Sequence, residues 1–67
     1  MKCKFILYFS ERKAPIEETV EFESETEFKY VVGVLKGHMA STYRFIYSIG
    51  RLVFDTSKLV AWSVEEV

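Results

Sequence analysis

A chain of 67 residues is long enough for one domain, residues 1–67, and it excludes a large buried core. Cys3 and His38 are the only cysteine and histidine, which excludes an internal disulfide and a closed zinc site with four ligands. The net charge of −1 provides no field that attracts nucleic acid, and no apolar run reaches the roughly 20 residues that span a bilayer. We therefore expect a cytoplasmic protein without metal, cofactor or membrane contact.

The first part of the chain predicts a β-hairpin. Residues 3–10 alternate between two sets of side chains and are rich in aromatic and branched types, as is typical of a strand. Residues 11–15 are polar and end in the only proline, which suits a connection between strands. Alternation resumes over residues 16–23, where one face is apolar and the other is acidic.

A helix is predicted to begin at Ser24. Ser24 and Glu27 have the spacing of a capping box, in which the Ser24 hydroxyl accepts from the Glu27 amide and the Glu27 carboxylate from the Ser24 amide. Lys36 and His38 fall in the last turn, and Gly37 is expected to end the helix in a left-handed conformation. The apolar residues at helical spacing are Phe28, Val31, Val32, Leu35 and Met39.

Three strands are predicted after the helix. They cover residues 42–48, residues 51–54 and residues 59–65, with a reversal at Gly50 and a turn over residues 55–58. The last strand is expected to carry Val60, Trp62 and Val64 on one face. The fold class is therefore α+β in the order β-β-α-β-β-β, with an antiparallel sheet of about five strands and one helix on one face.

Apolar residues are expected on both faces of this sheet. Ile6 and Tyr8 lie opposite to Phe5 and Leu7, and Ile46 lies opposite to Phe45 and Tyr47. Since one helix covers only one face, we expect a second subunit to cover the other, and hence a homo-oligomer.

The sequence contains no motif of an enzyme. His38, beside the predicted helix end, is expected to interact with free helix carbonyls, and Cys3 is expected to be a buried, inert thiol. A Cys–His pair stays open as an alternative, although no third residue is seen to orient it. We expect a protein that is not an enzyme.

Acidic residues are concentrated in one stretch, and two interpretations remain open. The stretch is either a solvated face or a negative stripe that meets a basic surface, on a nucleic-acid-binding host protein or on a second copy. For a protein target the candidate residues are Glu17, Glu21 and Glu23. The acids of the stretch are Glu17, Glu18, Glu21, Glu23, Glu25 and Glu27.

Aromatic and basic residues of the C-terminal half suit a nucleotide, because rings stack on a base and guanidinium groups bind phosphate. Lys36 and His38 at the helix end are candidate phosphate contacts. Two tyrosines of the set lie on the same face as Phe45, so a core or interface role stays open for them. The low net charge disfavours a nucleic acid as the ligand. The stacking and clamping candidates are Tyr43, Arg44, Tyr47, Arg51 and Trp62.

Residues 24–66 include Phe45-Ile46, Gly50-Arg51-Leu52-Val53-Phe54 and the run Asp55 to Trp62. This pattern resembles the C-terminal part of small uncharacterised accessory proteins encoded by phages and prophages of Gram-positive bacteria. The resemblance implies a small oligomeric domain that inhibits a host protein or sequesters a nucleotide-derived signal. We therefore expect a non-catalytic, homo-oligomeric binding protein in the cytoplasm of the host cell. The alternatives are a nucleic-acid-binding regulator and a structural subunit of a larger assembly.

Overall fold

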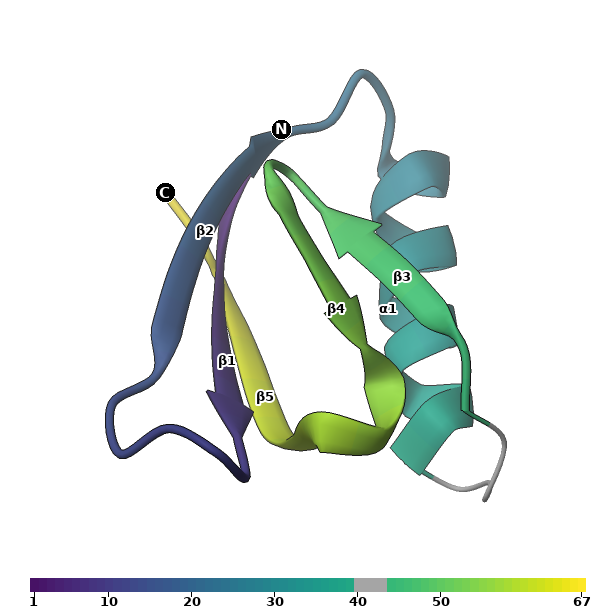
Figure 1. Ribbon diagram of the computed structural model, residues 1–67. Coiled ribbons are helices and arrows are strands. Elements are labelled where there is room, and N and C mark those ends of the chain that lie inside the picture. The colour runs from purple at the N-terminus through teal and green to yellow at the C-terminus, as the bar shows by residue number, and fades with distance from the viewer. Residues whose placement is uncertain (40–43) are drawn as a thin grey trace.

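The computed structural model describes residues 1–39 and 44–67, without the side chain of Met39. Five strands and one helix follow each other in the order β-β-α-β-β-β, which confirms the predicted α+β class. Figure 1 shows their arrangement. The elements are β1 (Lys2–Phe9), β2 (Ile16–Glu21), α1 (Glu25–Met39), β3 (Ile46–Ile49), β4 (Leu52–Asp55) and β5 (Leu59–Glu66), with a 3-10 turn at Thr56–Lys58 between the last two strands.

The strands are divided between two antiparallel sheets instead of forming the one sheet that was expected. One sheet has the order β2-β1-β5 and the other is the β3-β4 hairpin, with α1 behind the hairpin in Figure 1. Thr56, which is fully buried, ties the start of the hairpin to its end. Its amide donates to the Phe45 carbonyl at 2.9 Å, and its hydroxyl accepts from the Phe45 amide at 2.9 Å. These bonds hold the chain in a turn that carries it away from the hairpin before β5 begins.

The core lies between the two sheets and the helix. One side of β1 is fully buried, as the alternation predicted, and Leu35 of α1 has 0% exposure. Near the start of the chain, Phe22 contacts Phe5 and Phe28 edge to face at 6.1 and 5.8 Å between ring centroids. These contacts join the three-stranded sheet to the helix. The buried apolar residues are Cys3, Phe5, Leu7, Phe9, Phe22, Leu35, Ile49, Phe54 and Leu59.

A second series of aromatic rings crosses the hairpin. Phe54 of β4 contacts Phe9 at 5.3 Å and Tyr47 at 6.3 Å, and Phe45 lies between Tyr47 and His38 at 6.0 and 6.4 Å. All four contacts are edge to face, a favoured geometry for aromatic pairs. This series connects the end of the helix to the end of β1.

The helix begins with the predicted cap and ends later than expected. The Ser24 hydroxyl accepts from the Glu27 amide at 3.3 Å, but the Glu27 carboxylate accepts from the Glu23 amide at 3.0 Å, one residue before the expected donor. The helix continues through Gly37, so the prediction that this residue ends it is wrong. Within residues 1–39 and 44–67, no helix is long and apolar enough to cross a membrane.

The third and fourth strands start later than predicted, whereas β5 begins at Leu59 as predicted. The third strand was expected from residue 42 and β3 begins at Ile46, while residues 42 and 43 lie outside the described part of the chain. The last strand contains an irregularity, because Tyr8 faces Ala61 and Phe9 faces Leu59, which leaves Val60 without a partner in the register. Val60 is 54% exposed whereas Trp62 and Val64 are half-buried, so the expectation that the three share one face is wrong for Val60.

The outer face of the three-stranded sheet is polar, and the expectation of a bare apolar face is wrong for this sheet. The ammonium group of Lys4 lies between two carboxylates, 3.5 Å from Glu17 and 3.1 Å from Glu65. Ile6 is flanked by Glu17 and Ser63 and is half-buried, and Tyr8 is 42% exposed. The neighbouring strands thus supply charges that the alternation within one strand does not reveal. Apolar exposure is greater on the hairpin, where Ile46 is 66% exposed.

Candidate functional site

An open hollow of about 650 Å³ lies between the helix, the end of β2 and the start of the hairpin. Most of its wall is apolar or aromatic. The charged residues of the wall are both acidic, Glu21 and Glu27, and none of its lining residues is basic. We call this surface the acidic hollow. It is lined by Val20, Glu21, Phe22, Thr26, Glu27, Tyr30, Val31, Tyr47 and Ser48.

The two acidic residues that line the acidic hollow belong to different elements. Glu21 is the last residue of β2, its side chain is 70% exposed, and it forms an ion pair with the N-terminal ammonium at 4.0 Å. Glu27 stands in the first turn of α1, where it accepts one hydrogen bond from the Glu23 amide. A carboxylate has about four acceptor positions, so both groups retain capacity for a donor from outside the molecule.

Two tyrosines lie at the acidic hollow. Tyr30 projects from the helix and is 70% exposed, while Tyr47 of β3 is half-buried between the rings of Phe45 and Phe54. Burial raises the pKa of Tyr47, and the nearby Tyr30 raises it further. Tyr47 therefore stays neutral in the folded protein at ordinary pH, and the acidic hollow presents two phenol rings beside two carboxylates.

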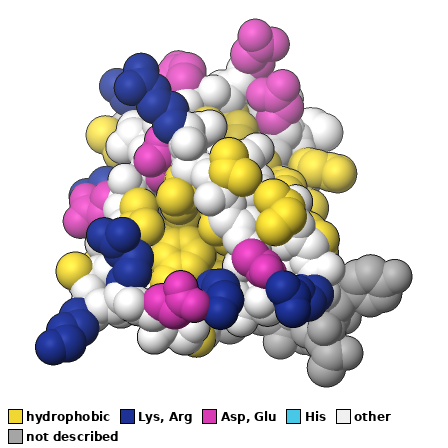
Figure 2. Space-filling model, in the orientation of Figure 1, with side chains coloured by type: hydrophobic (Ala, Val, Ile, Leu, Met, Phe, Trp, Pro, Cys, Tyr) yellow, Lys and Arg dark blue, Asp and Glu magenta, His cyan; other side chains and the backbone are white. Residues whose placement is uncertain are grey.

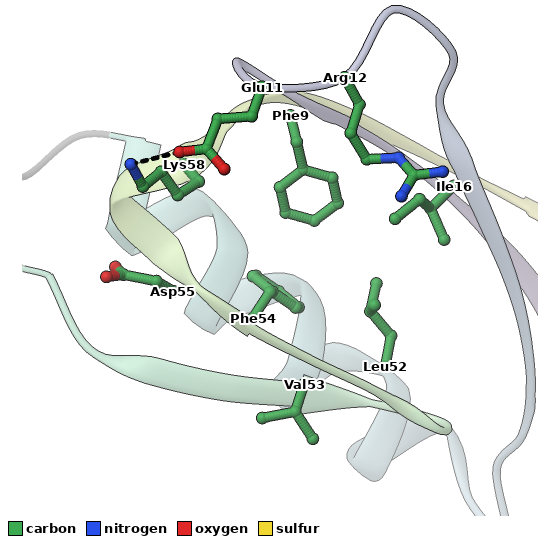
Figure 3. Close-up of a pocket in the computed structure, with 9 residues that line it drawn as sticks. All are labelled: Phe9, Glu11, Arg12, Ile16, Leu52, Val53, Phe54, Asp55 and Lys58. Carbon is green, nitrogen blue, oxygen red and sulfur yellow. Dashed lines mark ion pairs between the residues drawn. The ribbon is translucent and has the colours of Figure 1, made fainter.

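A smaller cavity of about 210 Å³ lies between the β1–β2 loop and β4 (Figure 3). The ring of Phe9 points into it from β1 and faces Phe54. Figure 2 shows apolar side chains in the centre of this side of the molecule and charged side chains of both signs around them. We call it the paired cavity. It is lined by Phe9, Glu11, Arg12, Ile16, Leu52, Val53, Phe54, Asp55 and Lys58.

Both acids of the paired cavity have a basic partner within the protein. Lys58 lies 2.6 Å from Glu11, and the hydrogen bond between them raises the pKa of Lys58. Asp55 accepts from the Ser57 amide at 2.9 Å and from Arg44 at 2.7 Å. These hydrogen bonds hold the pKa of Asp55 below its usual range, and the bonding to Ser57 has the largest effect.

The residues predicted to bind a nucleotide are not brought together at either hollow. Tyr47 alone among them lines the acidic hollow, and none of the set lines the paired cavity. Trp62 is half-buried on β5, and Arg51 lies in the turn of the hairpin. Arg44 is engaged with Asp55. Tyr43 lies outside the described residues.

The two candidates on α1 have different surroundings. Lys36 is exposed, whereas His38 is half-buried with its ring against Phe45. Nδ1 of His38 is buried and has no hydrogen-bond partner among the described residues. The expectation that His38 binds helix carbonyls does not account for this nitrogen.

The three predicted protein-binding acids follow β2 and the segment after it. Glu17 is paired with Lys4, Glu21 lines the acidic hollow, and Glu23 is exposed and donates its amide to Glu27. Glu21 is the one that the structure places beside an apolar surface. The sequence did not indicate Tyr30, because its exposure and its closeness to Tyr47 depend on the packing of the helix against the hairpin.

Glu18 has a structural role that the sequence did not indicate. It faces inward from β2 and accepts from the Arg51 amide at 2.9 Å, which fastens the tip of the hairpin to the three-stranded sheet. Gly50 has a φ of +60°, and a Cβ there would lie 2.5 Å from Oε1 of Glu18. The turn thus requires glycine for its conformation and for its contact with Glu18.

Comparisons of the chain with protein-family models, with curated proteins and with solved structures find no match.

Proposed function

We propose that this protein is a non-catalytic binding protein whose acidic hollow receives a basic side chain of a partner protein. The observation that carries the proposal is the composition of the acidic hollow, where two carboxylates and two tyrosines surround an apolar floor without a basic residue. An anionic ligand such as a nucleotide phosphate would meet repulsion there. An arginine of the partner fits, because its guanidinium stacks on aromatic rings and binds carboxylates in a fork geometry.

The neighbouring charges favour the same partner. Glu17 and Glu23 extend the negative surface from the acidic hollow along β2 and the following loop, although Lys4 offsets part of the charge at Glu17. Charge complementarity over such a surface increases the rate at which a basic partner associates and selects against acidic ones. We propose that the partner is a host protein with a basic surface, such as one that processes nucleic acid, in line with the resemblance to phage accessory proteins.

The proposal is tested with a fluorescent peptide that alternates arginine and valine, titrated with the protein and followed by anisotropy. A peptide in which glutamate replaces arginine is the matched control. We expect binding of the arginine peptide only, and we expect it to weaken from 50 to 200 mM salt because exposed charges are screened. Equal binding of the two peptides would contradict the proposal.

Substitutions locate the binding to the acidic hollow. Glu21→Gln with Glu27→Gln removes both charges and keeps an acceptor at the helix cap, since glutamine also serves in a capping box. At about 0.2–1 kcal/mol for each exposed ion pair, the double change is expected to weaken binding about two- to thirtyfold. Glu11→Gln removes an acid of the paired cavity and should leave the affinity unchanged. A similar loss in this control would show that only the net charge matters, and it would reject the acidic hollow as the site.

A further inference from the structure

We propose that two copies of this chain pair edge to edge along β5 and form a continuous six-stranded antiparallel sheet. This inference goes beyond the proposed function and uses a different surface from the acidic hollow. The three-stranded sheet has two edge strands, β2 and β5. These two edges differ in their charges, although both have open backbone groups.

Hydrogen bonding in an antiparallel pair alternates, so one observed bond fixes which backbone groups face outward. Phe22 and Met1 exchange two bonds, of 2.7 and 3.0 Å, and mark a bonded pair at the end of β2. Bonded and non-bonded pairs then alternate back along the register, and Glu17, Thr19 and Glu21 fall in the non-bonded pairs. Their N–H and C=O groups therefore point away from β1.

The same alternation applies to the other edge. The Val67 amide donates to the Lys2 carbonyl at 2.8 Å, which marks a bonded pair at the end of β5. The register then turns the backbone groups of Trp62, Val64 and Glu66 away from β1. Among the described residues, these groups have no hydrogen-bond partner on another element.

The two edge strands differ in how their charges would meet in a pair of identical copies. If β2 paired with a copy of itself about Thr19, Glu17 of each chain would lie opposite Glu21 of the other, and like charges directly opposed are destabilising. Charged side chains are a common means by which proteins protect an edge strand from pairing. The β2 edge is therefore unsuited to a second copy.

The β5 edge is uncharged over residues 59–64 and contains no proline. Pairing about Ser63 would place Trp62 opposite Val64 of the second copy, and Ala61 opposite Glu65. No like charges meet in this register, and aromatic residues opposite β-branched ones are favourable pairs. Trp62 and Val64 are half-buried, so the contact would complete their burial at the margin of a small core.

The first test measures the mass of the protein in solution by light scattering and then traps the pairing with cysteine. Ser63→Cys would lie opposite itself in a non-bonded pair, where Cα atoms are about 4.5 Å apart, within the range of a disulfide. The native Cys3 is 1% exposed and does not compete. We expect twice the chain mass for the unchanged protein, and rapid formation of a covalent dimer by Ser63→Cys but not by Thr19→Cys on the β2 edge.

The second test removes one open donor from each edge. Val64→Pro and Thr19→Pro each delete an N–H that points away from β1, so neither breaks the three-stranded sheet. We expect Val64→Pro to halve the mass and Thr19→Pro to leave it unchanged, with circular dichroism to confirm that both variants fold. The unchanged protein as a monomer at millimolar concentration would overturn the inference, as would cross-linking through residue 19 in preference to residue 63. A monomer that still binds the arginine peptide would reject this inference and leave the proposed function intact.

Discussion

The acidic hollow and the paired cavity differ chiefly in where their charges are neutralised. At the paired cavity, Lys58 and Arg44 neutralise Glu11 and Asp55 within the molecule. At the acidic hollow no lining residue is basic, and Glu21 lies 4.0 Å from the N-terminal ammonium, while no ion pair of Glu27 occurs among the described residues. A charged rim does not by itself indicate a binding site, because charges that are paired within the molecule have little capacity left for a partner.

The largest expected effect comes from the ring that serves both surfaces. Phe54 forms the wall of the paired cavity and contacts Tyr47 of the acidic hollow. Phe54→Ala should lower the free energy of unfolding by about 3–5 kcal/mol, measured by urea denaturation. A domain of this size has only about 3–10 kcal/mol in total, so we expect much of the variant to be unfolded.

Val53 provides the control for Phe54. It is the preceding residue of β4 and also borders the paired cavity, but it is 66% exposed whereas Phe54 is buried. Val53→Ala should change the free energy of unfolding by less than about 0.5 kcal/mol. Similar losses for the two variants would mean that the aromatic series does not join the two surfaces.

A second prediction uses one chemical change at two glycines. Gly50→Ala introduces a Cβ at positive φ and against Glu18, and it should destabilise the protein by about 1–2 kcal/mol. Gly33 is on the exposed side of the helix, and a Cβ added there would meet no described atom of another element within 4 Å. Gly33→Ala should therefore stabilise the protein by up to about 1 kcal/mol. Thermal denaturation measures whether each substitution raises or lowers the stability. Equal effects would contradict the role assigned to the hairpin tip.

Acid pH should lower the free energy of unfolding by protonating Asp55 at the paired cavity. Its pKa is lower in the folded state than in the unfolded chain, so its stabilising effect is present above about pH 4 and is lost as the pH falls through the folded value. Asp55→Asn should make the unfolding free energy less dependent on pH between 5 and 2. An unchanged slope would show that this carboxylate does not support the fold.

Alkaline pH should act on the acidic hollow through Tyr47. Burial raises its pKa in the folded state, so its contribution to the free energy of unfolding is present below about pH 10. That contribution is lost as the pH rises through the pKa of the folded state. Tyr47→Phe should reduce the loss of stability above pH 10, as followed by near-ultraviolet circular dichroism. Tyr8→Phe, on the polar outer face, is the matched control and should leave the loss as it is.

Local sequence patterns predicted the elements well, because they depend on neighbours along the chain. The alternation from Cys3 to Phe9 gave the buried side of β1, and Ser24 gave the start of the helix. Contacts between distant residues could not be predicted in this way. The division into two sheets depends on Thr56 bonding to Phe45, and the polar outer face depends on Glu17 and Glu65 approaching Lys4.

The candidate sites were predicted less completely than the fold. The acidic stretch was recognised from composition, and Glu21 does lie at the acidic hollow. The aromatic part of that surface was missed, because Tyr30 and Tyr47 come from different elements and their proximity depends on how the hairpin sits against the helix. The basic and aromatic residues grouped as a nucleotide site are instead distributed over separate elements, with Arg44 engaged by Asp55.

The most direct test of the proposed binding function is a nuclear magnetic resonance titration of the labelled protein with the arginine peptide. We predict that amide signals of Glu21, Glu27, Tyr30 and Tyr47 shift progressively as peptide is added, while those of Glu11 and Lys58 stay in place. Shifts confined to the paired cavity, or spread evenly over all acidic residues, would contradict it.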